Sequence, residues 1–397
     1  MREFKELLPY SEALERMLSN PLETGVENVG LENAVGRVLS DDVSSPIDSP
    51  PFDRAAMDGY AIRAEDSFGY REGHPVELRV IDDITAGQVS SKAVSPGAAV
   101  GIMTGAKMPE GADCVIMQEF TSRSGDTLKL MSKIPPSKNV SVRGEDTHLG
   151  DKVLMSGTRL SPRHLAYVRS LGVDAVTVKA RPKVSIIVTG DEFNLTKKSE
   201  EGKIFESNSL MLSKLLDAIG CDVREMSIVP DDEGKIQDAI ASAAGKSDLL
   251  LITGGSSFGK KDMAHKLFDK FVFHGVTIKP GRPFGFTLRG GMPCFIMSGY
   301  PVAAYVQFCL FVIPYIESAM GTTILKRAFL PIGVERPSAL GRMEFVRCRI
   351  VAGNVEPIRS SGSSMISSLA MADGYILIDE LTEGINPGEM IEFTYFL

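Results

Sequence analysis

Two stretches decide the fold: residues 183–192 read KVSIIVTGDE, and residues 248–259 read DLLLITGGSSFG. Each is a continuous apolar run that ends in glycine and polar residues, which is typical of a strand buried on both faces. Between them, the spacing of apolar residues predicts helices over 208–219 and 234–244 and a strand over 222–229. Strands that alternate with helices predict a three-layer α/β domain with a mostly parallel sheet.

The same domain is expected to continue on the C-terminal side. A helix is predicted over 262–271, and the apolar run 305–316 contains Gln307 and is interrupted by Pro314. A membrane span needs about 18 or more apolar residues, so this run is interpreted as a buried helix. Near the N-terminus, Ser11 is expected to cap a helix, and Ser161-Pro162 has the cap-and-proline pattern of another helix start.

The regions on either side of this core differ in character. The segment 44–51 is rich in proline and serine, and short apolar runs split by glycine and proline follow it. These features predict β-rich domains outside the α/β core. The domains expected are a discontinuous domain over 1–46 and 140–180, a β-rich domain over 47–139, the α/β domain over 181–320, and a C-terminal β-rich domain over 321–397.

Composition excludes several classes of protein. The chain has 397 residues, 43% of them hydrophobic and 24% charged, and a net charge of −8, which disfavours nucleic-acid binding. The five cysteines and five histidines show no metal-ligand spacing. The charged N-terminus lacks the apolar segment of a signal peptide, so a cytoplasmic protein without membrane contact is expected.

Ligands of open α/β sheets bind beyond the carboxyl ends of the strands. The loop that contains Gly254, Gly255, Ser256 and Ser257 follows a predicted strand and offers N–H groups and hydroxyls to a phosphate. It lacks the spacing of a P-loop, and an ordinary turn is the alternative.

Acidic residues follow the other predicted strands. Glu192 and the pair Asp231-Asp232 stand at two strand ends, where carboxylates suit Mg²⁺ bound to a substrate phosphate. The alternatives are a helix cap for either aspartate and a solvated loop for Glu192. Lys279 and Arg282 flank a proline–glycine turn, which is either an oxyanion site or a solvated hairpin.

Several ordered motifs resemble one known family over nearly the whole chain. They are residues 56–61 (AMDGYA), 102–106 (IMTGA), 109–113 (PEGAD), 143–146 (RGED), 189–192 (TGDE) and 279–284 (KPGRPF). In this order they are similar to the MoeA-type molybdopterin molybdenumtransferases, a family that includes the E-domain of gephyrin.

The resemblance implies an elongated homodimer whose active site is shared between subunits. It implies that the domain over 1–46 and 140–180 is an elongated linker and dimerisation domain and that the domain over 321–397 is β-barrel-like. Adenylyl-molybdopterin and molybdate would be the substrates, Mg²⁺ the cofactor, and molybdenum cofactor and AMP the products. The resemblance also implies contact with molybdopterin adenylyltransferase, whose fold is similar to the α/β domain.

The resemblance also assigns roles to individual residues. Asp58, Thr104, Glu192 and Asp262 would be catalytic, and Glu192, Asp231 and Asp262 would surround Mg²⁺. Substrate binding is expected at Asp146, Asp231, Gly254, Gly255, Ser256, Ser257, Lys279, Arg282, Arg347 and either Ser363 or Ser364.

The chain departs from the family pattern at two places. The family usually has GGVSVG where residues 254–259 read GGSSFG, and PGNPVS where residues 298–303 read SGYPVA. Tyr300 and Ala303 thus replace an asparagine and a serine. Two alternatives therefore stay open: an altered paralogue that serves as a molybdopterin-binding scaffold or carrier, and an enzyme that inserts tungstate.

Overall fold

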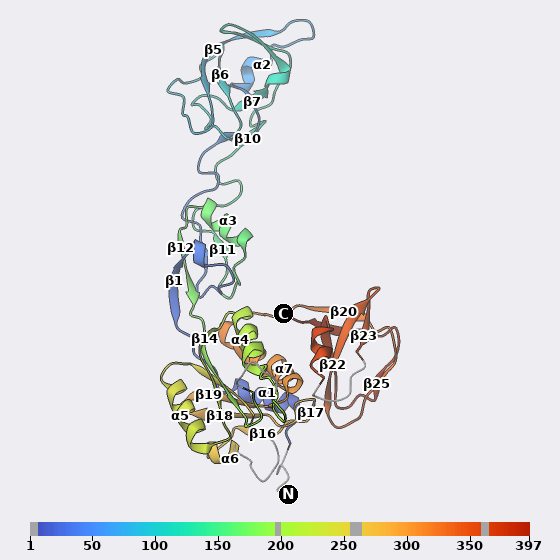
Figure 1. Cartoon of the computed structure of the whole chain (residues 1–397). Helices are drawn as coiled ribbons and strands as arrows, with labels where there is room; N and C mark the ends of the chain where they lie inside the picture. Colours follow the sequence, from blue (N-terminus) through green and yellow to red (C-terminus); the bar gives the residue numbers. More distant parts are fainter. Residues whose placement is uncertain (1–6, 195–199, 255–263, 359–364) are drawn as a thin grey trace. The chain divides into compact units, whose positions relative to one another are not determined.

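The computed structural model describes residues 7–194, 200–254, 264–358 and 365–397. The chain forms two compact units (Figure 1). Unit 1 comprises Met1–Glu27, Gly36–Val38 and Val178–Leu397, and unit 2 comprises Asn28–Val35 and Leu39–Thr177. Each unit has its own clusters of buried hydrophobic side chains.

Unit 1 is built on a six-stranded sheet with the order β14-β13-β15-β19-β18-β16. Its strands are β13 (Lys183–Thr189), β14 (Asp222–Val229), β15 (Leu249–Thr253), β16 (Phe273–His274), β18 (Gly285–Arg289) and β19 (Met292–Met297). The first four in spatial order are parallel, and β18 and β16 are antiparallel additions. The predicted α/β domain with a mostly parallel sheet is confirmed.

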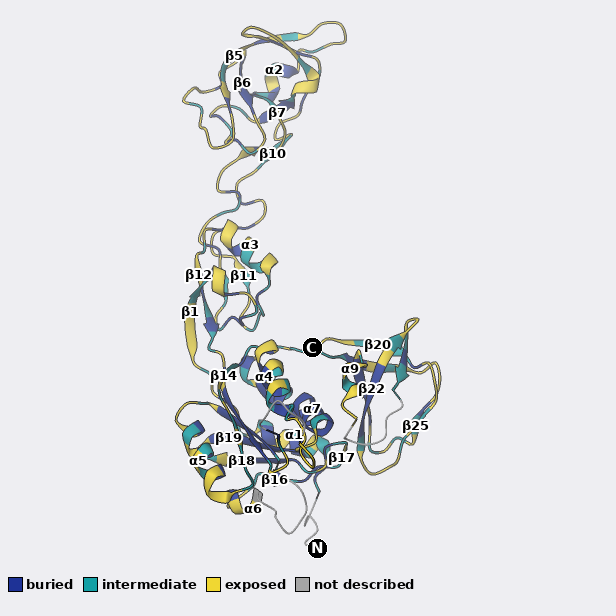
Figure 2. Cartoon of the chain, viewed as in Figure 1, coloured by how far each residue is buried: buried dark blue, intermediate teal, exposed yellow. Residues whose placement is uncertain are grey.

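Helices cover both faces of this sheet. One face carries α1 (Tyr10–Leu18), α4 (Asn208–Ala218), α7 (Pro301–Gln307), the π-helix η3 (Phe308–Val312) and α8 (Ile313–Met320). The other face carries α5 (Glu233–Ala244) and α6 (Ala264–Leu267). Successive strand residues therefore pack to opposite sides: Leu251 belongs to the first cluster, and Leu250 and Ile252 belong to the second. All three residues are buried, and Figure 2 shows the central strands of the sheet as buried.

The apolar helical run is longer than the sequence predicted. Helical structure continues from Pro301 to Met320 through η3, and Pro314 does not break it. Pro314 lies in the first turn of α8, after the π-helical turn, where its missing N–H group has little effect. The run is long and apolar enough to cross a membrane, but 78% of it is buried inside the structure, as in a core helix of a globular domain.

The C-terminal part of unit 1 is a second, largely antiparallel sheet with the order β17-β22-β24-β26-β20, and β23 pairs with β22. Its strands are β17 (Ile278–Lys279), β20 (Arg327–Pro331), β22 (Met343–Val351), β23 (Asn354–Pro357), β24 (Gly374–Ile378) and β26 (Met390–Tyr395). A ribbon of β21 (Arg336–Pro337) and β25 (Gly384–Ile385) and the short helix α9 (Ser367–Ala370) complete it. Because β17 leaves the α/β domain and pairs with β22, Lys279 comes to lie opposite Glu344.

Unit 2 contains a six-stranded sheet with the order β7-β4-β6-β5-β9-β8. Its strands are β4 (Gly59–Ile62), β5 (Val76–Ile84), β6 (Ala98–Ile102), β7 (Cys114–Met117), β8 (Thr121–Ser124) and β9 (Thr127–Leu130). Smaller pairs join β2 (Val43–Ser44) to β11 (Lys152–Leu154), β3 (Arg54–Ala55) to β10 (Val140–Ser141), and β1 (Val26–Gly30) to β12 (Ala175–Lys179). The helices are η1 (Leu31–Asn33), α2 (Ala64–Ser67), η2 (Gln118–Phe120) and α3 (Pro162–Ser170).

The predicted helix starts had different outcomes. Ser161 occupies the cap position of α3, as expected, and its N–H group donates to Nδ1 of His164 (3.2 Å). The Ser161 hydroxyl oxygen itself is buried and makes no hydrogen bond to the described residues. Ser11 does not cap α1, because the helix begins at Tyr10 and Pro9 occupies the cap position. Of the helix predicted over 262–271, residues 262 and 263 lie outside the described residues, and the described part forms α6, which ends at Leu267, four residues earlier than expected.

Candidate functional site

The parallel strands of unit 1 end together at one edge of the sheet. The N–H group of Gly190, after β13, donates to the carbonyl oxygen of Val229 at the end of β14 (3.2 Å). The N–H group of Gly254, after β15, donates to the carbonyl oxygen of Met297 at the end of β19 (3.3 Å). The chain segments predicted to carry ligand-binding residues therefore lie next to one another.

Gly254 has a backbone conformation that favours glycine. Its φ is +93°, and a Cβ atom there would collide with the backbone oxygen of Thr189 and lie 2.6 Å from its hydroxyl oxygen. A Cβ atom added at Gly299 would lie 3.5 Å from the Cα atom of Gly254. Glycine at position 254 therefore allows the end of β15 to lie directly against the end of β13.

Buried polar atoms gather at this edge. Among the residues that the structure describes, the hydroxyl oxygens of Thr189 and Thr253 and the side-chain oxygen of Asn208 are buried and accept or donate no hydrogen bond. All three residues are at most 3% exposed. A buried polar atom without a partner lowers stability, so such atoms are commonly found where a ligand or water completes the bonding.

The acidic residues at the edge have distinct surroundings. The carboxylate of Asp191 accepts a hydrogen bond from the N–H group of Asp231 (3.1 Å). Asp232 caps α5 by accepting a hydrogen bond from the N–H group of Lys235 (2.9 Å). For this residue, the structure thus has the helix cap that the sequence offered as the alternative to a metal ligand. The carboxylate of Glu192 folds back over Gly190, in space that a Cβ atom would occupy.

These acids do not form a complete protein cage for a metal. Within the described part of the chain, no group of three or more His, Cys, Asp or Glu side chains could hold a metal ion. Mg²⁺ usually takes one or two carboxylates and completes its octahedron with water and substrate phosphate.

Some predicted site residues lie outside the described residues. They are Gly255, Ser256, Ser257, Asp262, Ser363 and Ser364.

Lys279 makes an ion pair that the sequence did not reveal. Its ammonium nitrogen lies 2.8 Å from one carboxylate oxygen of Glu344, and Arg336 lies 3.1 Å from the other oxygen. Glu344 is only 4% exposed, whereas the Lys279 side chain is half-exposed. Glu344 thus fixes Lys279 at the surface while keeping its positive charge partly balanced.

The remaining cations differ in exposure. Arg282 is exposed in the turn that follows Lys279. Arg347 lies on β22, three residues after Glu344, and is 5% exposed, and this burial lowers the pKa of its guanidinium group. Among the described residues, Lys279 and Arg282 are therefore exposed enough for a dissolved anion to reach them, whereas Arg347 is buried.

In unit 2, the structure brings Asp58 and Thr104 together. The carboxylate of Asp58 accepts hydrogen bonds from both the hydroxyl and the N–H group of Thr104, each 2.7 Å long. These bonds hold the pKa of Asp58 below its ordinary value. Asp146 is also exposed, and the hydroxyl of its neighbour Thr147 lies 3.4 Å from its carboxylate.

The two departures at the start of α7 have opposite environments. Tyr300 is 61% exposed, and Ala303 is 3% exposed. The side chain at position 300 therefore faces a ligand or solvent, while the side chain at 303 packs inside the domain.

Three family models match the chain in order. Residues 8–172 match the MoeA N-terminal region (domain I and II), residues 185–318 match the "Probable molybdopterin binding domain", and residues 330–396 match the MoeA C-terminal region (domain IV). Together they cover most of the sequence.

Individual relatives match over nearly their full length. The molybdopterin molybdenumtransferase of Bacillus subtilis is 33% identical over 99% of this chain and 95% of its own. That of Haemophilus influenzae is 32% identical over 98% and 99%. The crystal structure of the molybdopterin biosynthesis moeA protein from Pyrococcus horikoshii OT3 is 40% identical, with a TM-score of 0.87 over 98% of this chain and 100% of that chain.

Proposed function

Because the chain belongs to the MoeA family of molybdopterin molybdenumtransferases, we propose that it inserts molybdate into adenylyl-molybdopterin and releases AMP in a Mg²⁺-dependent reaction. Its place in molybdenum cofactor biosynthesis and its class as a transferase follow from the family. In the proposed reaction, water cleaves the phosphoanhydride bond of the substrate and AMP leaves. Molybdenum becomes bound to the two dithiolene sulfurs as Mo–O bonds of molybdate break, and the lost oxygen leaves as water with the protons of the thiols.

The observation that carries the proposal is the polar, glycine-lined edge of the unit 1 sheet. Gly254 lets the end of β15 lie directly against the Thr189 backbone, and the buried oxygens of Thr189, Thr253 and Asn208 beside it have no hydrogen-bond partner among the described residues. A site with such polar groups already in place gains affinity by satisfying them, and it discriminates against ligands that cannot.

Lys279 and Arg282 would attract the oxyanion and the phosphates. Lys279 supplies a point charge, and Arg282 supplies a planar fork that matches two oxygens of one anion. Glu344 keeps Lys279 extended at the surface, so the anion meets an ordered cation rather than a freely rotating one. Holding molybdate close to the dithiolene contributes to the rate by positioning.

Glu192 and Asp231 are the described carboxylates that would hold Mg²⁺, and the ion would offset the negative charge of the phosphoanhydride. Asp231 is oriented through its own N–H group, which is bonded to Asp191. In unit 2, Asp58 is held ionised by Thr104 and would act as a fixed acceptor for a donor group of the substrate or a bound water.

The family relationship also supports a cytoplasmic homodimer with an active site shared between subunits, and contact with molybdopterin adenylyltransferase as the source of the substrate. The oligomeric state is tested directly by sedimentation of the purified chain.

The function is tested by incubating the purified protein with adenylyl-molybdopterin, Mg²⁺ and molybdate. AMP is measured by chromatography, and the cofactor by activation of a molybdenum enzyme that lacks it. We expect AMP release that requires both molybdate and Mg²⁺, and Glu192→Gln is expected to lose it. A protein that binds the pterin without releasing AMP would instead be a carrier, and a preference for tungstate would identify the metal inserted.

A further inference from the structure

Gln307 is a fully buried amide, 0% exposed, at the end of α7. Its amide nitrogen donates to the carbonyl oxygens of Gly281 (2.7 Å) and Pro283 (2.9 Å). Its amide oxygen accepts from the N–H group of Ser298 (2.8 Å). The amide nitrogen thus donates both of its hydrogens to the loop at 281–283, and the amide oxygen accepts from the loop at Ser298.

The loop that receives both donated bonds is the turn that carries Lys279 and Arg282. Gly281, between them, has a φ of +112°, and a Cβ atom there would lie 3.2 Å from the Cγ atom of Gln307. The loop therefore lies directly on the Gln307 side chain. Any side chain that cannot donate twice would leave at least one of these two carbonyl groups without this partner.

The other bond reaches the edge of the parallel sheet. Ser298 follows β19 and precedes Gly299, whose carbonyl oxygen accepts from the side-chain amide of Asn208 (2.8 Å). The residue before Ser298, Met297, accepts a hydrogen bond from the N–H group of Gly254 at the end of β15 (3.3 Å). One amide side chain thus connects the loop that carries the cations to the edge that carries the unpaired buried oxygens.

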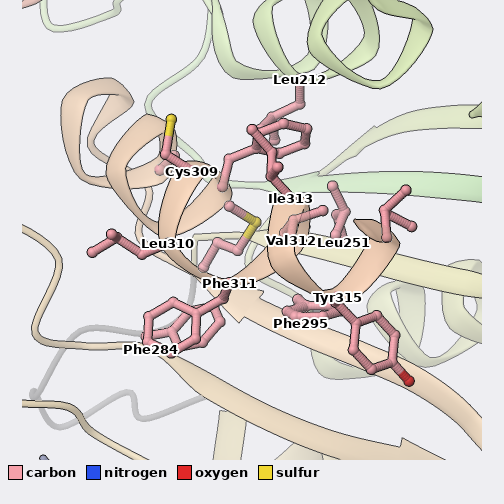
Figure 3. Close-up of a cluster of buried hydrophobic side chains, with 14 of the residues drawn as sticks. Leu212, Leu251, Phe284, Phe295, Cys309, Leu310, Phe311, Val312, Ile313 and Tyr315 are labelled. Carbon is pink, nitrogen blue, oxygen red and sulfur yellow. The ribbon is translucent and has the colours of Figure 1, made fainter. Parts of the chain in front are cut away.

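The helix that contains Gln307 also contacts the end of the loop through an aromatic pair. Gln307 is followed directly by the π-helical turn η3, whose Phe311 stacks on Phe284 with ring centroids 4.2 Å apart (Figure 3). Phe284 immediately follows Pro283, so the same helix fixes the end of the loop as well as its middle. π-helical turns of this kind are frequent at functional sites.

We propose that Gln307 is a positioning residue that sets the distance between the cations of the 279–283 loop and the ligand-binding edge of the sheet. The inference rests on the proposed function, in which the loop binds the oxyanion and the edge binds the pterin. Gln307 contacts neither ligand. It acts by holding the two binding regions in register, so its loss is expected to weaken the capture of molybdate.

The test compares Gln307→Met with Thr287→Val. Methionine keeps the volume of glutamine but loses all three bonds. Thr287→Val removes a similarly buried bond in the same sheet, from the Thr287 hydroxyl to the carbonyl oxygen of Lys270 (2.6 Å), which lies outside the proposed site. If Gln307→Met does not fold, Gln307→Glu, which keeps the shape and the acceptor oxygen, takes its place.

In the Gln307 variant, the KM for molybdate is expected to rise about tenfold or more, with a smaller change in kcat. Amide hydrogen exchange should quicken at Ser298 and over residues 279–284, and Thr287→Val should change neither. An unchanged KM with unchanged exchange in the Gln307 variant overturns the inference. Inactive wild-type protein would reject the proposed function alone, because exchange and the stabilisation of the protein by molybdate report on the loop without turnover.

Discussion

The carboxylate of Asp58 is held by Thr104 through two hydrogen bonds of 2.7 Å, although the residues are 46 positions apart. Antiparallel pairing explains the contact. Asp58 directly precedes β4, and Met103 alone separates Thr104 from the end of β6. Gly59 of β4 pairs with Ile102 of β6. Neither turn has a sequence pattern that predicts this contact, and the two turns come together because strands β4 and β6 pair.

This pair predicts a change in acid titration. Thr104→Val removes the hydroxyl bond, the largest cause of the lowered pKa of Asp58, so that pKa should rise toward its ordinary value of 3.8. Because the folded pKa lies below the unfolded one, the bond stabilises the protein fully above pH 3.8, and the stability is lost as the pH falls through the folded pKa. The Tm difference between wild type and variant should therefore shrink in acid.

Thr121→Val is the matched control, since the Thr121 hydroxyl is also exposed in unit 2 but bonds only to the carbonyl oxygen of Gln118. NMR titration of the Asp58 carboxyl group measures the pKa directly. If Asp58 titrates identically in wild type and Thr104→Val, the hydroxyl bond does not hold the charge.

Glu344→Gln should separate stability from anion binding. The change leaves Lys279 and Arg336 without their shared carboxylate and should lower the free energy of unfolding by about 2 kcal/mol. It also makes the surface around Lys279 more positive, so molybdate should raise the Tm of the variant more than that of the wild type. Thermal unfolding with and without molybdate measures both effects.

Glu392→Gln provides the comparison, because Glu392 forms an exposed ion pair with Arg327 in the same domain. Such pairs contribute little, so this variant should behave like the wild type. Equal molybdate-induced shifts in all three proteins would place the oxyanion away from Lys279.

Gly254→Ala should destabilise unit 1. At a φ of +93°, the new methyl group meets the Thr189 backbone, and the strained conformation alone costs about 1–3 kcal/mol. Gly245→Ala, at the end of α5, has a helical φ of −86° and open space, so it should be neutral or stabilise by about 0.4–1 kcal/mol. Urea unfolding of the two variants tests the contrast, and equal stabilities would contradict the close packing at Gly254.

The sequence allowed the α/β sheet to be predicted because its signals are local. The strand predicted over 222–229 is β14, and the apolar run that begins at residue 183 forms β13 (Lys183–Thr189). Short strand-like runs that alternate with segments of helical spacing favour a parallel α/β sheet. The resemblance placed Asp58 and Thr104 among the catalytic residues, and the structure brings the two into contact.

Other features depend on contacts that no local pattern reveals. Glu344 meets Lys279 across 65 residues, and in the sequence it is a lone acid in an apolar strand. In the sequence, Gln307 is only a polar interruption of an apolar run, whereas in the structure its side-chain amide is hydrogen-bonded to two loops. Pro314 was interpreted as a break because the π-helical turn before it leaves no recognisable sequence pattern.

The neighbouring aspartates Asp231 and Asp232 should respond in opposite ways to alanine substitution. Asp232 caps α5, so Asp232→Ala should lower the free energy of unfolding by about 1 kcal/mol and leave the activity of the folded protein unchanged. Asp231 is placed by its backbone bond to Asp191, which alanine keeps, so Asp231→Ala should fold normally. Loss of the Asp231 carboxylate should raise the Mg²⁺ concentration needed for AMP release, because the ion then lacks one candidate ligand. Urea unfolding and a Mg²⁺ titration of turnover, run on both variants, measure these effects. If Asp231→Ala shows the wild-type Mg²⁺ requirement while Asp232→Ala changes it, the roles assigned to the two carboxylates are reversed.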